Sequence, residues 1–133
     1  MGYALTTIVD KSFEDTLQAT RAALSEQGFG ILTEIDLKAT LKSKIDADIA
    51  PQVILGACRP TLAHAALQAE HSIGLLLPCN VVVRALAEHR TAVEAMDPAI
   101  MVQLTGNDAL SGVADEASTR LRAALTSLGA AAV

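Results

Sequence analysis

Aromatic side chains are scarce in this chain of 133 residues, which has no tryptophan, one tyrosine and two phenylalanines. Proteins that bind single-stranded nucleic acid stack bases on aromatic rings, so the sequence does not favour such a surface. Positive charge is also scarce: the chain has ten Lys and Arg residues but fifteen Asp and Glu residues, so its net charge is −5. Affinity for a phosphate backbone comes from clustered positive charge, so we predict no nucleic-acid partner.

Long hydrophobic runs are missing as well. A membrane-spanning helix needs roughly 20 consecutive apolar residues, and no run approaches that length, so no membrane partner is predicted. The opening residues, MGYALTTIVD, lack the charged and apolar regions of a secretory signal. The two cysteines are too few for a disulfide scaffold. We therefore expect a cytoplasmic protein with reduced thiols.

Short catalytic motifs are absent too. The sequence contains no Walker loop, no G-x-G-x-x-G, no G-x-S-x-G and no H-E-x-x-H. His64 and His71 lie seven residues apart, roughly 10 Å along a helix axis, which is too far to share one ion. These patterns indicate no particular cofactor or activity, and whether the protein is an enzyme stays open.

The residues that are present are mostly aliphatic, since 51% of the chain is hydrophobic and few of these side chains are aromatic. Hydrophobic periodicity, helix caps and the positions of Gly and Pro divide the chain into alternating strands and helices. This order predicts one domain (1–133) of the α+β class, with a central sheet and helices packed mainly on one face. The predicted strands are 3–9, 30–36, 52–57, one within 72–88 and 91–96; the predicted helices are 12–27, 37–45, 60–70, 98–105 and a last one capped by Asn107.

The fourth predicted strand contains an interruption, Pro78-Cys79-Asn80, inside an apolar run. Proline within a strand indicates a sheet edge or a bulge, and an apolar edge invites pairing with another chain. We therefore predict a homodimer. Asn80 would then bond to backbone groups that Pro78 leaves unpaired.

Cys58 is the first candidate for chemistry. It follows the third predicted strand, and Pro60 opens a helix two residues later, so the helix N-terminus would favour a thiolate. If the third and fourth strands are neighbours, Cys79 lies close by. Two cysteines are too few for a structural zinc ion but can contribute to a soft-metal site. The alternative is that both are small buried apolar residues.

Charged residues cluster in the second strand and the helix after it. Glu34 is polar within a strand, and with Lys38 it is a candidate for the rim of a ligand site. Asp36 is more simply read as the N-cap of the helix. Lys38 and Lys42 lie four residues apart, which is typical of a solvated helix face.

Three long blocks resemble the signature blocks of the bacterial and archaeal domain of unknown function 302 (DUF302) family: GFGILTEIDLKATLKSKI (28–45), ILGACRPTLAHAAL (54–67) and IGLLLPCNVVVR (73–84). AMDPAIM (95–101) and the last helix are also similar to that family. The resemblance implies a curved, mostly antiparallel sheet shaped like the TATA-binding-protein fold, and it implies dimers, but no activity. Arg59, Thr61 and the absence of an aromatic residue near Pro51 depart from the pattern. The family residues that map here are Glu34, Asp36, Lys38, Thr40, Cys58, Pro60, Ala63, Leu67, Pro78, Cys79, Asn80 and Val81.

The sequence leaves three functions open. The first is a homodimeric module that binds or senses a small ligand or a soft metal ion. The second is a purely structural role, in which the motif residues only shape the fold and the dimer. The third is a thiol enzyme that depends on Cys58. The candidate ligand residues are Glu34, Lys38, Cys58, Cys79 and Asn80, with Cys58 and Cys79 as the metal ligands.

Overall fold

The computed structural model describes residues 2–129, in which strands and helices alternate as the sequence predicts. The α+β class is confirmed, with one five-stranded antiparallel sheet in the described chain. The elements are β1 (Ala4–Val9), α1 (Phe13–Glu26), β2 (Gly30–Asp36), α2 (Leu37–Ile45), β3 (Gln52–Cys58), α3 (Pro60–Ala69), a 3-10 helix (Ile73–Leu76), β4 (Cys79–Ala87), β5 (Arg90–Met96), α4 (Ala99–Thr105), a second 3-10 helix (Asp108–Leu110) and α5 (Ser111–Thr126).

Local signals set most of these boundaries. The Ser12 hydroxyl accepts the Asp15 amide at 3.2 Å and begins α1. The Asp36 carboxylate accepts the Ala39 amide at 2.9 Å and begins α2, so Asp36 is the predicted cap. Asn107 differs from the prediction, because it caps the short 3-10 helix before α5 and not α5 itself.

The strands are ordered β1-β5-β4-β3-β2. Of the two predictions for Pro78, a sheet edge or a bulge, the edge is wrong, because β4 pairs with β3 on one side and β5 on the other. Pro78 comes just before β4 begins, where a missing N–H does not interrupt the ladder. The register irregularity in β4 lies between Ala85 and Ala87, away from Pro78. The two edges of the sheet are β1 and β2.

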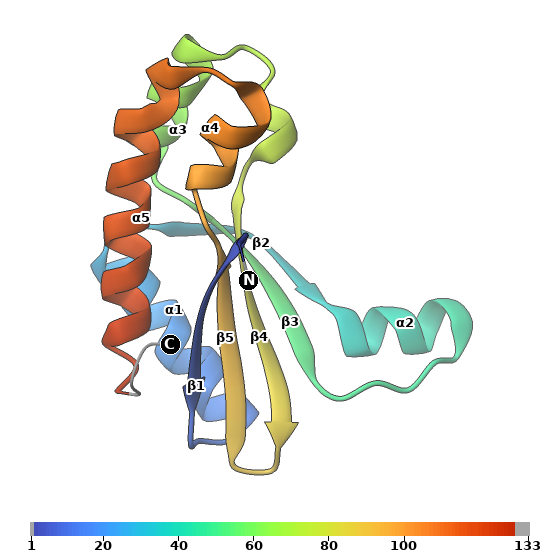
Figure 1. Cartoon of the computed structure of the whole chain (residues 1–133). Helices are drawn as coiled ribbons and strands as arrows, with labels where there is room; N and C mark the ends of the chain where they lie inside the picture. The colour runs from blue at the N-terminus through green and yellow to red at the C-terminus, as the bar shows by residue number, and fades with distance from the viewer. Residues whose placement is uncertain (1, 130–133) are drawn as a thin grey trace.

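Helices α1 and α5 pack on one face of the sheet and on each other, as Figure 1 shows. Side chains that point to this face are buried along β1, β3, β4 and β5, whereas β2 has no buried residue. The opposite face carries no helix within the described chain. The buried core residues that the strands contribute include Leu5, Val9, Val53, Leu55, Val81, Val83, Val93 and Ala95.

Helices α3 and α4 lie at one end of the sheet and enclose a second, smaller core with the start of α5 (Figure 1). Helix α2 projects from the sheet, on the side away from α5 (Figure 1). None of the described helices combines the length and the apolar character that a bilayer-crossing segment requires. The smaller core contains Ala66, Ile73, Met101, Leu110 and Ala114.

Candidate functional site

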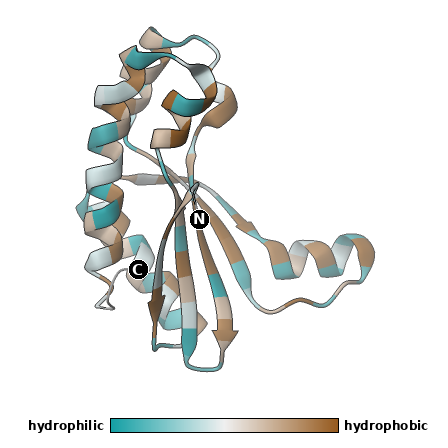
Figure 2. Ribbon diagram, viewed as in Figure 1, coloured by the Kyte–Doolittle hydropathy of each residue, from teal (hydrophilic) through white to brown (hydrophobic). Residues whose placement is uncertain are grey.

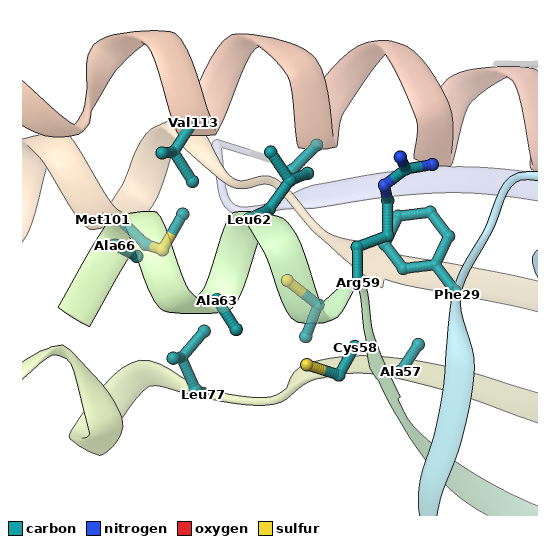
Figure 3. Close-up of a pocket in the computed structure, with 12 residues that line it drawn as sticks. Phe29, Ala57, Cys58, Arg59, Leu62, Ala63, Ala66, Leu77, Met101 and Val113 are labelled. Atoms are coloured by element: carbon teal, nitrogen blue, oxygen red, sulfur yellow. The ribbon is translucent and has the colours of Figure 1, made fainter. Parts of the chain in front are cut away.

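Both cysteines line one pocket at the end of the sheet that α3 and α4 cover. Ala57 of β3 pairs with Cys79 of β4, and Cys58 follows Ala57 as the last residue of β3. Cys58 is partly exposed and Cys79 is buried. Figure 3 shows the labelled side chains converging from the strands and helices around this pocket. The residues that line it are Phe29, Ala57, Cys58, Arg59, Leu62, Ala63, Ala66, Leu77, Cys79, Met101, Val113 and Ala117.

The pocket is small and its lining is apolar apart from sulfur and the Arg59 side chain. About 20 Å³ is open to the centre of a water-sized sphere, which is room for about one water molecule or one metal ion. Pockets for drug-sized ligands measure roughly 300 to 1,000 Å³. The space beside the two thiols therefore suits an ion much better than an organic molecule.

Burial and the neighbouring Cys58 both act on the Cys79 thiol. The pKa of Cys79 is raised from 9.0 to about 11, first because burial penalises the thiolate and second because the charge of Cys58 repels it. Cys79 is consequently a neutral thiol at physiological pH, and it is not a nucleophile in that form. A bound cation would remove the proton and the repulsion together.

Arg59 closes one end of the pocket. It donates a hydrogen bond from Nη1 to the Gln27 carbonyl oxygen, and its Nη2 lies 3.8 Å from a carboxylate oxygen of Glu116 on α5. Figure 3 shows the guanidinium directed toward α5 and away from Cys58. The Arg59 side chain therefore ties β3 and the start of α3 to α5, while the thiols face the cavity without a charged partner of their own.

Met101 is a third sulfur-bearing residue in the lining, and the sequence reasoning missed it. It is buried on α4, and it reaches the pocket because α4 packs against α5 and shares the smaller core with α3. The signal in the sequence was weak, since Met101 reads as an ordinary apolar position of a short helix. Thioether and thiolate sulfur are both soft ligands.

Histidines and carboxylates do not add to this site. His64 and His71 are exposed, and neither lines the pocket. Within residues 2–129 no three side chains of the His, Cys, Asp and Glu types come together in a way that would hold a metal ion. Sulfur ligands are therefore the metal-binding chemistry that the pocket offers.

The model of the family described as "Domain of unknown function DUF302" matches residues 5–128. The chain belongs to the DUF302 family. Its fold is similar to a crystal structure of an uncharacterised conserved DUF302 protein from Bacillus stearothermophilus, with a TM-score of 0.86 and 28% sequence identity over 95% of this chain and 98% of that one. No protein with a curated description matches the sequence.

The three DUF302-like blocks fall in two places in the structure. Blocks 54–67 and 73–84 form β3, α3 and the start of β4, and they meet at the thiol pocket. Block 28–45 forms β2 and α2, at the sheet edge and on the projecting helix, and it reaches the pocket at its start, where Phe29 lines the pocket and Gly30 pairs with Cys58. The rest of this block, from Leu32 onward, does not line the pocket.

Glu34 and Lys38 lie in this separate block and do not line the thiol pocket. Glu34 is exposed on β2 and forms an ion pair with Arg21 of α1. The Lys38 ammonium group donates to the Ile49 carbonyl oxygen at 2.9 Å, which holds the end of the following loop against α2. These contacts within the chain account for the Glu34 and Lys38 side chains without a ligand.

Asn80 lies next to Cys79 in β4, so its side chain points to the opposite face of the sheet. It is exposed and lines a hollow on that face together with Tyr3, Val82 and Glu94. Of the five candidate ligand residues, the structure brings together Cys58 and Cys79, and it places Glu34, Lys38 and Asn80 elsewhere.

Proposed function

We propose that this DUF302 chain is a soft-metal binding module that holds one Cu(I) ion between Cys58 and Cys79, and that it works as a homodimer. The observation that carries the proposal is that both cysteines of the chain line one small apolar pocket. A sensing role is consistent with a site that has room for an ion and no catalytic partner beside it. A reducing cytoplasm would keep both thiols free to bind.

The ligand chemistry favours Cu(I) over Zn(II). Structural zinc takes four ligands, usually Cys or His, and these side chains are too few here. Thiolate and thioether ligands select Cu(I), and Met101 supplies a thioether in the same lining. Two thiolates and a thioether can complete the coordination of a Cu(I) ion, so the apolar cavity does not have to supply a fourth ligand such as water. Binding releases the thiol protons, so affinity rises with pH.

Titration of the reduced protein with Cu(I), in competition with a coloured Cu(I) chelator, tests this function. We expect one ion per chain and a much weaker response to Zn(II). Cys58→Ser and Cys79→Ser should each lower the Cu(I) affinity at least about tenfold, since each removes a ligand. Met101→Leu should lower it less, and Met96→Leu is the matched control because Met96 lies outside the pocket.

Two results would count against the proposal. The first is the complete transfer of Cu(I) from the wild-type chain to an equimolar amount of the coloured chelator. The second is serine variants that bind as tightly as wild type. If wild type binds no metal and the serine variants mainly lower the melting temperature, the motif residues serve packing, as the structural hypothesis holds.

The homodimer is the second part of the proposal. Because β4 is an interior strand, the edge that offers itself for pairing with a second copy is β2, whose residues from Leu32 to Asp36 are all exposed. Sedimentation equilibrium of the full chain tests it, and a monomer across the micromolar range would contradict it.

A further inference from the structure

A Cu(I) ion held by two thiolates would give the thiol pocket a net negative charge. The thiolates of Cys58 and Cys79 carry one negative charge each, the ion carries one positive charge, and the Met101 thioether is neutral. The strands that lead to the pocket, β3 and β4, are mostly hydrophobic, as Figure 2 shows, and the lining is apolar apart from sulfur and Arg59. A charge in such surroundings is costly unless it is paired. The proposed metal site therefore requires a positive group nearby.

Arg59 is the positive group that the pocket offers. Among the described residues that line the pocket, no other side chain is positively charged. The Arg59 side chain is 18% exposed. Gly28 makes room for it, because a Cβ at Gly28 would lie 2.6 Å from Arg59 Nη1. The guanidinium is therefore part of the pocket wall and not a free surface charge.

The Arg59 guanidinium has one donor without a partner. Nη1 donates to the Gln27 carbonyl oxygen, and Nη2 lies 3.8 Å from a Glu116 carboxylate oxygen. Nε is buried and has no acceptor within the described chain. Most buried donors are hydrogen-bonded, so this one requires an explanation. A thiolate sulfur that forms when a metal ion binds is a stronger acceptor than a neutral thiol, and it would supply the missing partner.

The strand register places Cys79 on the same side of the sheet as Arg59. Arg59 retains an extended backbone (φ −99°, ψ 110°), so its side chain leaves the chain on the same side as that of Ala57, two residues earlier. Ala57 is the cross-strand partner of Cys79, and the two members of such a pair point to one face. Nε is the guanidinium nitrogen nearest the main chain. It is therefore the nitrogen that can donate toward Cys79 while both Nη groups keep their partners.

We propose that Arg59 is a positioning residue of the metal site, whose charge compensates the two-thiolate Cu(I) centre and whose Nε donates a hydrogen bond to the Cys79 sulfur. This inference rests on the Cu(I) function proposed above and adds to it a residue that is not itself a ligand. Hydrogen bonds to ligand atoms orient the ligands and tune metal affinity. Glu116 competes for the same guanidinium, but its carboxylate is half exposed, so water screens that ion pair.

Two metal ions of different charge separate this role from simple packing. Arg59→Met retains an unbranched side chain but removes the charge and the donor. It should lower the Cu(I) affinity at least about tenfold, as replacement of a residue that orients a metal ligand usually does. The Hg(II) affinity should change much less, because two thiolates neutralise a divalent ion and leave no charge to compensate. Competition with dithiothreitol measures both affinities, and Arg59→Lys should recover part of the Cu(I) affinity.

Two substitutions on α5 serve as controls. Arg120 also pairs with Glu116, at 3.9 Å, but it does not line the pocket, so Arg120→Met should leave the Cu(I) affinity unchanged. Glu116→Gln breaks the tie between Arg59 and α5 and removes the competing anion, so the Cu(I) affinity should stay equal or rise. Circular dichroism verifies that each variant is folded.

The outcomes distinguish this inference from the metal function itself. A wild-type chain that binds no Cu(I) contradicts both. If the wild-type chain binds Cu(I), an unchanged Cu(I) affinity in Arg59→Met, or an equal loss of Cu(I) and Hg(II) affinity there, overturns the role of Arg59 alone. A loss in Glu116→Gln as large as that in Arg59→Met also overturns it, because the contact with α5 would then be what matters. If Arg59→Met does not fold, the Glu116→Gln titration decides: equal or tighter Cu(I) binding supports the role of Arg59, and weaker binding overturns it.

Discussion

Burial of the Cys79 thiol couples the stability of the fold to pH. Its pKa is about 11 in the folded chain against an ordinary value of 9.0, with burial as the first cause and Cys58 as the second. Between these pH values the folded chain retains a proton that the unfolded chain has lost, so the free energy of unfolding falls as the pH rises. The shift corresponds to about 2 to 3 kcal/mol, present in full below the unfolded pKa and lost as the pH passes the folded pKa.

Urea unfolding from neutral pH to about pH 11 measures this coupling. The wild-type chain should lose about 2 to 3 kcal/mol more than Cys79→Ala over that range. Arg59 also lines the pocket and is present in both proteins, whereas Cys58 interacts with Cys79, so the comparison measures the two thiols as a pair. Parallel pH profiles for the two proteins would contradict the buried, neutral thiol.

Gly56 is a position where the fold requires the absence of a side chain. A Cβ there would lie 2.9 Å from Pro78 Cγ and would overlap the Thr33 side chain. Gly56→Ala should therefore destabilise the fold by about 1 to 3 kcal/mol, as overpacking usually does. Gly30→Ala is the matched control, because its Cβ would meet only the Cys58 carbonyl oxygen at 3.8 Å. Equal unfolding free energies for the two variants would refute the crowding at Gly56.

At the scale of elements, the cap of α2 should act locally. Asp36→Ala removes the carboxylate that accepts the Ala39 amide, a change of about 0.5 to 2 kcal/mol in helix stability. Because α2 contributes no buried residue, hydrogen exchange should accelerate in α2 while the global unfolding free energy hardly changes. Ser12→Ala at the cap of α1 is the contrast, since α1 packs on the core and its loss should lower global stability. A global loss in Asp36→Ala would contradict the independence of α2.

The elements themselves could be predicted because their signals are local. Each helix end is signalled by a residue at or next to that end, and the structure confirms these positions. The signals are the caps Ser12 and Asp36, Gly28 after the first helix and Pro60 at the start of the third. Which strands lie next to each other in the sheet cannot be inferred from adjacent residues in the sequence. Pro78 looked like an edge signal, yet it precedes an interior strand, because a proline before the first strand residue is compatible with any position in a sheet.

The pocket was predictable in part. Cys58 and Cys79 were expected to meet if β3 and β4 were neighbours, and those strands do pair. Asn80 could have been separated from the thiols, since adjacent strand residues point to opposite faces. Met101 could not have been assigned, because its place depends on how α4 packs against α3 and α5, and nothing in its own segment specifies that packing.

At the scale of the whole molecule, the two thiols lie at the end of the sheet that α3 and α4 cover, whereas the exposed residues from Leu32 to Asp36 lie along the β2 edge. The metal site and the homodimer should therefore be separable by mutation. Cys58→Ser and Cys79→Ser should lose Cu(I) affinity and retain the dimer, whereas Leu32→Lys should weaken the dimer and retain Cu(I), because a charged side chain on an edge strand opposes pairing. Metal titration and sedimentation of the same three variants measure this. A variant that lost both properties while still folded would contradict the independence of the two sites.

The most direct test of the central claim is X-ray absorption at the copper edge of the Cu(I)-loaded chain. The lining of the pocket predicts a coordination shell made of sulfur alone, from Cys58, Cys79 and Met101. Met101→Leu should remove one sulfur from that shell and leave two. A shell that contains nitrogen or oxygen, or one that is unchanged in Cys58→Ser and Cys79→Ser, would contradict the assignment of the soft-metal site to this pocket.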